Sequence, residues 1–156
     1  MYMPDHPIHY LVFRLEEQLF AIAITDVERV FRALWVTPVA DAPPILSGLV
    51  NLRGQVVPVL NLRLRLELPE RMIDPEDRLI LLPGKMPCCF FVDRIEGVIP
   101  IDNGAIQPPG SLSPHLEPLL DGVVQHQQQT VLLLPKKRLL QPLLSVAQPV
   151  LADVAS

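Results

Sequence analysis

The chain has 156 residues, of which 49% are hydrophobic and 19% are charged. A chain of this size and composition can bury a real core, so intrinsic disorder is excluded as its class. The formal net charge of −4 argues against non-specific nucleic-acid binding, which requires an excess of lysine and arginine. No apolar run approaches the roughly 18 residues of a membrane span, and the N-terminus lacks the pattern of a secretory signal. We expect a cytoplasmic protein without membrane insertion.

The N-terminal part of the chain predicts a leader followed by a hairpin. Residues 1–8 show no apolar period, which predicts a flexible leader. Two runs of strand-forming residues, 9–15 and 19–24, flank the polar segment 16–18 and predict two paired strands. The domain is expected to begin at residue 9.

A short helix is expected directly after the second strand. Thr25 and Glu28 stand at the spacing of a capping box, in which the threonine caps the backbone and the glutamate reaches back. The helix would then run to about Phe31, with apolar residues at helical spacing. A kinked continuation of the strand is the alternative.

The most informative stretch of the sequence lies between Gly48 and Arg63. Its two apolar runs, residues 49–52 and 55–60, meet at a tight turn. Gly54 can take the positive φ that two-residue hairpin turns often require, which places Arg53 at the tip. An apolar hairpin with one arginine at its tip can be a core element with a solvated charge, or it can be a docking element.

The second half of the chain continues with short strands. A charged, proline-bounded connector at 69–77 is the expected boundary between two lobes, and strands follow at 78–82, 88–92 and 95–101. A long loop then leads to a hairpin with the polar tip 125–129. Many short strands with little helix predict a mainly β protein built from paired small barrels.

The C-terminal part predicts one more helix. Pro135 can open it at the first helical position, and Leu139, Leu140, Leu143 and Leu144 would form its apolar face. Pro142 should end or kink this short helix. The domain is therefore expected to end at residue 141, with 142–156 as a C-terminal tail that is frayed from residue 145.

The sequence contains no recognisable catalytic, cofactor-binding or metal-binding motif. The histidines, His6, His9, His115 and His126, are scattered without metal-ligand spacing. Cys88 and Cys89 are adjacent, so on a strand they point to opposite faces and act as core thiols rather than as a disulfide. A thiol-dependent enzyme that uses one of them is a distant alternative. We expect no enzyme and no cofactor.

The central stretch resembles the signature of the CheW family, the coupling proteins of bacterial chemotaxis. The shared pattern is Gly-x-x-Asn-Leu-Arg-Gly-x-x-x-Pro-x-x-x-Leu-Arg, which begins at Gly48. Further resemblance lies in 9–15, 19–22, 27–30, 91–98, 106–109 and 130–134, so that it covers about residues 9 to 141. The resemblance implies two SH3-like β-barrels packed side by side on a shared core.

The resemblance also implies a non-catalytic adaptor in two-component signal transduction. Such a protein couples the cytoplasmic tip of a chemoreceptor to the regulatory domain of a histidine kinase, and it is held at the receptor array through these partners. The alternative is a module of the same fold that associates with itself or with other CheW-like proteins in a non-flagellar pathway such as twitching motility.

Seven residues form the candidate binding site that the resemblance implies. The receptor-facing positions correspond to Val27, Gly48 and Arg53, and the hairpin that presents them is completed by Asn51, Leu52 and Gly54. Val36 is the candidate on the kinase-facing surface. Core packing is the alternative role for Val27 and Val36.

Three departures from the family pattern suggest a divergent member. Asn61 replaces the usual aspartate and would remove a negative charge near Arg63. Pro135 replaces the residue that caps the last helix, and the usual glycine of the first turn is absent from 16–18. These departures put the partners in doubt more than the fold.

Overall fold

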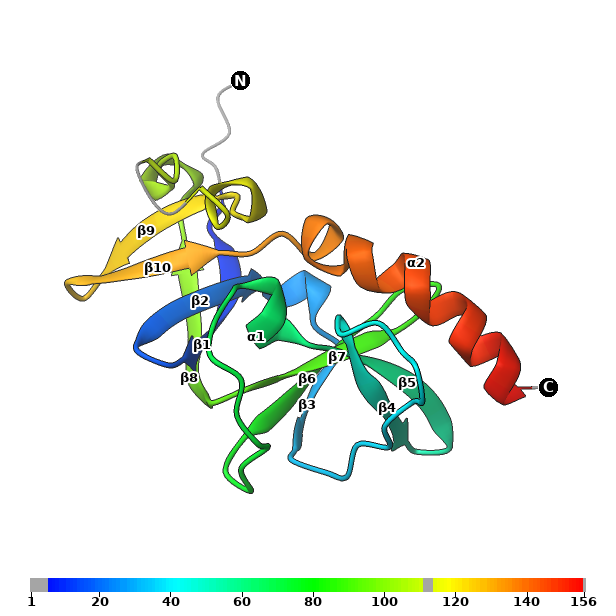
Figure 1. Cartoon of the computed structure of the whole chain (residues 1–156). Helices are drawn as coiled ribbons and strands as arrows, with labels where there is room; N and C mark the ends of the chain where they lie inside the picture. The colour runs from blue at the N-terminus through cyan, green and yellow to red at the C-terminus, as the bar shows by residue number, and fades with distance from the viewer. Residues whose placement is uncertain (1–5, 111–113, 156) are drawn as a thin grey trace.

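The computed structural model describes residues 6–110 and 114–155 (Figure 1). This part of the chain forms two five-stranded sheets, here called the first and the second barrel. The strand order of the first barrel is β8 (Arg94–Ile101), β1 (Ile8–Leu15), β2 (Gln18–Ala23), β10 (Gln129–Leu133) and β9 (Gly122–His126). The strand order of the second barrel is β3 (Arg29–Arg32), β6 (Arg78–Leu82), β7 (Cys88–Val92), β5 (Gln55–Leu60) and β4 (Leu46–Leu52).

The expected mainly β class with paired small barrels is confirmed. Neighbouring strands are antiparallel in both barrels, apart from the parallel pairs β2–β10 and β5–β7. Two α-helices, α1 (Leu62–Arg65) and α2 (Lys136–Ala155), accompany the strands. Three short 3₁₀ helices complete the list: Ile24–Asp26, Asn103–Ala105 and Glu117–Leu119. The expected leader falls largely on residues 1–5, which lie outside the described residues.

The chain crosses between the barrels twice, and neither crossing is the connector at 69–77. β1 and β2 belong to the first barrel, β3 to β7 form the second, and β8 to β10 return to the first. The crossings are therefore the segment 24–28 and residue Asp93. The connector joins α1 to β6 within the second barrel, so its prediction as the lobe boundary is wrong. Its prolines and charges mark a surface loop.

The two barrels are one five-strand unit with its strands cyclically shifted. Strands β3-β4-β5-β6-β7 of the second barrel take the same places in the sheet order as β8-β9-β10-β1-β2 in the first. Each barrel also contains one isolated bridge to its second strand, Thr37–Leu49 and Gln107–Val123. The correspondence makes Gly122 the counterpart of Gly48, and the β9–β10 turn the counterpart of the β4–β5 turn.

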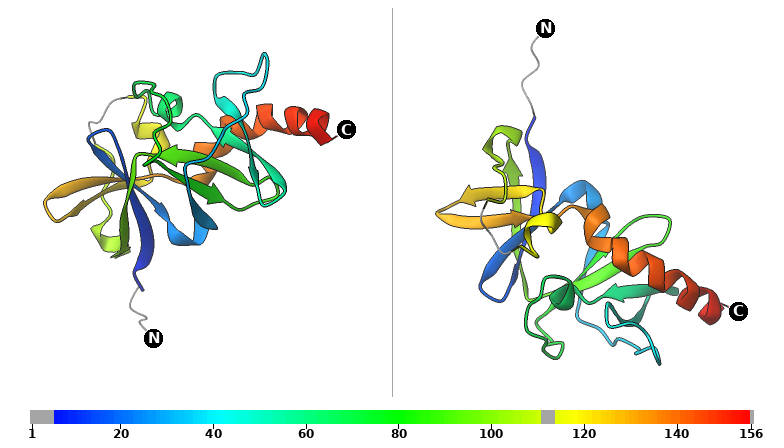
Figure 2. Two further views of the ribbon diagram at one scale, coloured as in Figure 1. Left: turned by 90° about the horizontal axis from the view of Figure 1, so that it is seen from below. Right: turned by 45° about the horizontal axis from the view of Figure 1, so that its top comes forward.

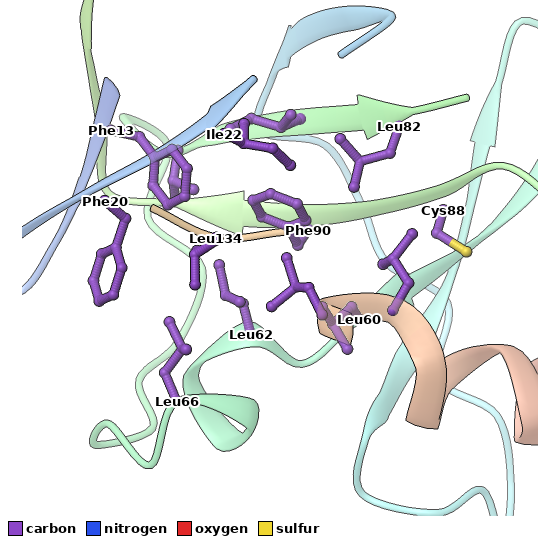
Figure 3. Close-up of a cluster of buried hydrophobic side chains, with 14 of the residues drawn as sticks. Phe13, Phe20, Ile22, Leu60, Leu62, Leu66, Leu82, Cys88, Phe90 and Leu134 are labelled. Atoms are coloured by element: carbon purple, nitrogen blue, oxygen red, sulfur yellow. The ribbon is translucent and has the colours of Figure 1, made fainter. Parts of the chain in front are cut away.

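A single apolar cluster joins the barrels (Figure 3). Phe13 and Phe20 from the first barrel meet Phe90 from the second, with ring centroids 6.0 Å (Phe13–Phe20) and 5.8 Å (Phe13–Phe90) apart. Cys88 lies in this interbarrel cluster, while Cys89 lies in the separate core of the second barrel. The two thiols thus point to opposite faces of β7 and are both free and buried, as expected from their adjacency.

The helix expected from the capping box is only partly present. A 3₁₀ turn spans Ile24–Asp26, and the chain then extends into β3 at Arg29. The Glu28 N–H donates to the Leu81 carbonyl at 2.8 Å, which is a sheet-like contact. The helix to Phe31 is therefore wrong, and the alternative of a kinked strand describes the segment. Pairing with β6 outweighs the local capping signal.

The C-terminal helix is longer than expected because it continues through Pro142 and Pro149 to Ala155. The expected tail is therefore helical as far as the structure describes it. Proline 142 has no N–H, so it cannot bond the carbonyl of Arg138, four residues earlier. Arg65 of α1 supplies the missing donor: its Nη2 donates to the Arg138 carbonyl at 2.8 Å.

No helix in the described ranges is long and apolar enough to span a membrane.

An ion-pair network lies at the second crossing. Arg63 of α1 and Arg71 of the connector both donate to the Asp93 Oδ1, each at 2.6 Å, and the Glu16 N–H donates to Oδ2 at 2.8 Å. Arg63 also pairs with the Glu16 carboxylate. The Asn61 substitution therefore leaves Arg63 paired. The Asn61 Oδ1 instead accepts from the Leu64 N–H at 3.1 Å and caps α1.

Candidate functional site

The β4–β5 hairpin ends in the tight turn that the sequence predicts. Arg53 and Gly54 are its central residues and both have positive φ, 55° and 84°. Asn51 fixes the turn because its Oδ1 accepts from the Gly54 N–H at 2.8 Å. Leu52 is 7% exposed and anchors the tip in the core of the second barrel. The hairpin is thus a braced element rather than a loose loop.

Arg53 is the exposed charge of this tip. The side chains of three arginines make no hydrogen bond or ion pair to the residues that the structure describes: Arg29, Arg32 and Arg53. All three belong to the second barrel, and Arg29 lies over the Phe31 ring, with its guanidinium carbon 5.4 Å from the ring centroid. The other arginines donate to carboxylates or backbone carbonyls. This barrel therefore presents unneutralised guanidinium groups on a protein of net negative charge.

Gly48 has a different environment from Arg53. It is buried, with φ of 153°, and a Cβ built on it would lie 2.4 Å from the Thr37 carbonyl oxygen and 2.7 Å from Val36 Cγ1. The segment that bridges to β4 crosses directly over this glycine. Gly122 repeats the arrangement, since its Cβ would lie 2.7 Å from the Gln107 carbonyl oxygen and 2.5 Å from Ile106 Cγ2. Because each barrel needs a glycine where this segment crosses the strand, Gly48 and Gly122 have a structural role in building the barrels.

Val36 and Val27 are both half-buried, but in different cores. Val36 packs against the core of the second barrel, and Val27 packs against the interbarrel cluster just after the first crossing. The structure thus brings Val36 and Gly48 together beneath the bridging segment and presents Asn51, Arg53 and Gly54 at the surface. Val27 belongs to another part of the molecule.

The sequence analysis did not include Trp35 among the site residues. Its side chain is 82% exposed, directly before the half-buried Val36. Because Thr37 pairs with Leu49 in antiparallel register, Trp35 lies near the level of Asn51, close to the hairpin tip. Tryptophan and arginine are the residue types enriched in binding hot spots. One sequence signal could have identified Trp35 as a site residue: it is a single tryptophan in a segment that shows no apolar period.

The thiols are unsuited to nucleophilic chemistry. Burial raises the pKa of Cys88 to about 11, although the nearby Lys136 opposes part of this effect. Burial also raises the pKa of Cys89 far above its ordinary value. Because the thiolate is the reactive form, both groups stay protonated near neutral pH. Within residues 6–110 and 114–155, no group of three or more histidine, cysteine or acidic side chains is placed to hold a metal ion.

Fold and hairpin together define a class: a β protein of two packed barrels that presents an arginine on a braced turn. The family model of the CheW-like domain matches residues 9–143. The chain therefore belongs to the CheW-like domain family.

The relatives agree with this assignment. The chemotaxis protein CheW of Bacillus subtilis is 34% identical over 98 residues, which cover 62% of this chain and 63% of that protein. The chain thus spans slightly less than two thirds of that relative. Protein FrzA of Myxococcus xanthus is 30% identical over 135 residues, covering 85% of this chain and 84% of FrzA. The crystal structure of the scaffolding protein TtCheW from Thermoanaerobacter tengcongensis matches with a TM-score of 0.75 and 26% identity, over 86% of both chains.

Proposed function

We propose that the protein is a non-catalytic adaptor that couples the cytoplasmic tip of a chemoreceptor to the regulatory domain of a histidine kinase. Membership of the CheW-like family supports this function, as does the likeness to a solved protein described as a scaffold. The buried, protonated thiols fit a role without catalysis. The protein would work in the cytoplasm, at the receptor array, where its partners hold it.

The observation that carries the proposal is the exposed Arg53 on its braced hairpin. An arginine at the surface contributes little to folding when it has no partner. The same guanidinium becomes valuable when a partner's carboxylates or helix-end carbonyls desolvate it. The turn fixes the backbone of Arg53 before binding, so the entropy lost on association is mainly that of the arginine side chain. Trp35, near the level of Asn51, would supply an apolar contact through which the segment around Val36 meets the kinase.

Replacement of Arg53 by glutamate tests the proposal. Arg53→Glu should leave the melting temperature within about 2 °C of the wild type, because the side chain is exposed and unpaired. Association with a receptor-tip fragment or with the kinase regulatory domain should weaken at least tenfold, which corresponds to about 1.4 kcal/mol. Calorimetric titration with each purified partner measures both affinities.

Arg94→Glu is the matched control. Arg94 lies on the first barrel, and its side chain is 66% exposed. The same charge reversal there should leave both affinities within a factor of two. Wild-type binding by Arg53→Glu would move the docking surface away from the hairpin, and unfolding of Arg53→Glu would make its role structural.

The second candidate function is an association module that pairs with itself or with other CheW-like proteins in a non-flagellar pathway. The observation that favours it is the match to FrzA, which covers a larger share of this chain than the match to the Bacillus subtilis protein. Sedimentation of the purified protein separates the two. A concentration-dependent oligomer that does not bind a receptor tip supports the module.

A further inference from the structure

A groove of about 930 Å³ runs along α2, facing the turn between β6 and β7. One wall is the helix face that carries Leu140, Leu144 and Leu151, and the opposite wall is the turn 83–86. Figure 2 shows α2 lying along the molecule with its C-terminal end extending outward. None of the seven predicted site residues lines this groove, so it is separate from the hairpin surface.

All three lysines of the chain line the groove. They are Lys85 from the β6–β7 turn and Lys136 and Lys137 from the first turn of α2. Lys136 donates to the Pro83 carbonyl, whereas Lys85 and Lys137 are exposed and make no ion pair to the described residues. Two acidic side chains also line the groove, and one of them, Asp121, is already paired with Arg138. The groove is therefore locally basic on a protein whose net charge is −4.

The helix wall of the groove is apolar. Leu140 is 3% exposed, Leu144 is 36% exposed and Leu151 is half-buried. Their spacing places them on one face of α2 over roughly 16 Å, about three helical turns. The other face of the same helix, with Leu139, Leu143 and Ala147 all at 0% exposure, packs into the interbarrel cluster. Leu140 also belongs to this cluster, so the part of the groove wall that remains partly open is formed by Leu144 and Leu151.

We propose that this lysine groove binds an amphipathic helix of a partner protein whose apolar stripe is flanked by acidic residues. A partly apolar groove beside a helix can accept a second helix by packing of ridges into grooves. Lys85 on one wall and Lys137 on the other face the two edges of such a helix, so glutamates or aspartates there are favoured over lysines. This partner site is additional to the hairpin surface of the proposed adaptor.

A pair of designed peptides tests the proposal with the full-length chain. One fluorescein-labelled peptide of 18 residues carries a leucine stripe at helical spacing, with glutamates on both flanks. The other has the same stripe with lysines instead. Fluorescence anisotropy should show saturable binding of the acidic peptide, at least tenfold tighter than binding of the basic peptide.

Substitutions in the groove test whether the acidic peptide binds there. Lys85→Glu/Lys137→Glu and, separately, Leu144→Glu should each weaken the acidic peptide at least tenfold. Arg32→Glu/Arg94→Glu makes the same change in net charge away from the groove, and it should leave binding within a factor of two. Binding of the peptide and binding of the receptor-tip fragment are measured separately, so failure of the groove is distinguished from failure of the hairpin surface.

Three results would overturn the proposal. The first is absence of saturable acidic-peptide binding at millimolar protein. The second is equal loss in the groove variants and in the Arg32→Glu/Arg94→Glu control, which reduces the effect to net charge. The third is saturable binding of dodecanoate without peptide binding, which makes a small anionic amphiphile the occupant instead of a helix.

Discussion

Gly48 and Arg53 belong to one hairpin and meet opposite surroundings. Gly48 is buried under the backbone of Thr37, whereas Arg53 extends from the turn into solvent. The substitution Gly48→Lys therefore cannot test partner binding by blocking a surface, because its Cβ already collides with the chain's own backbone. Loss of binding in such a variant would report damage to the barrel.

Gly48→Ala should destabilise the protein without any partner present. The new Cβ meets a carbonyl oxygen at 2.4 Å and requires a φ that alanine rarely adopts. We expect a loss of about 1–3 kcal/mol in the free energy of unfolding, measured by urea denaturation. Gly104→Ala is the control, since a Cβ there has no neighbour within 4 Å. Equal stability of the two variants would contradict the architectural role.

Single residues were predictable from the sequence where their local chemistry decides the structure. Gly54 at a two-residue turn and the opposed thiols Cys88 and Cys89 follow from backbone geometry alone. The burial of Gly48 and the exposure of Trp35 do not, because both depend on where the segment after β3 crosses β4. That crossing is a long-range event without a local signal.

At the scale of elements, α2 shows how a distant side chain can preserve a helix. Pro142 leaves the Arg138 carbonyl without its helical donor, and Arg65 replaces that donor from another element. The Arg65 Nε also approaches the Leu139 carbonyl at 3.4 Å. The sequence predicts that the helix ends or kinks at Pro142, because proline removes a helical donor. It does not reveal the replacement donor, because Arg65 lies far from Arg138 along the chain. The strands and hairpins were predictable because their apolar period and turn residues are local.

Arg65→Ala should destabilise α2 by leaving the Arg138 carbonyl unsatisfied. A hydrogen bond to a charged group contributes about 1.5–3 kcal/mol, which is the expected loss in the free energy of unfolding. Amide exchange over residues 136–150 should accelerate more than exchange in β4 and β5.

A double-mutant cycle with Pro142→Ala isolates the cause. Alanine at 142 restores an N–H that can bond the Arg138 carbonyl, so the loss caused by Arg65→Ala should fall by at least half in that background. An equal loss in both backgrounds would show that Arg65 stabilises the protein in another way.

At the scale of the whole molecule, Asp93 fastens one barrel to the other at the second crossing. Burial alone would raise the pKa of its carboxyl group, but the Glu16 N–H and the guanidinium groups of Arg63 and Arg71 outweigh burial and hold the pKa below its ordinary value. A carboxylate with a lowered folded pKa stabilises the protein above its unfolded pKa. This stabilisation is lost as the pH falls through the folded value.

Asp93→Asn should therefore lower the free energy of unfolding by about 1–3 kcal/mol at pH 7, from the loss of charged hydrogen bonds. The difference from the wild type should begin to shrink below about pH 4, where the unfolded chain takes up a proton at Asp93, and it should vanish once the pH falls below the lowered folded pKa. Urea denaturation at several pH values measures this. Asp121→Asn is the control: its pair with Arg138 is about half exposed, so the loss should be about 0–1 kcal/mol. A difference between Asp93→Asn and wild type that is independent of pH would contradict the network's role.

The first barrel is built from strands at both ends of the chain, so the second barrel can fold before the first during protein synthesis. The strands of the second barrel are complete once Val92 has emerged from the ribosome. At that point the first barrel still lacks three strands, and it is complete only when Leu133 has emerged. The N-terminal hairpin, with Phe13 and Phe20, is made first and is enclosed last. During translation it is an exposed apolar surface of the kind that recruits chaperones or nucleates aggregation. A ribosome stalled between these two points would hold a finished barrel tethered to an unfinished one.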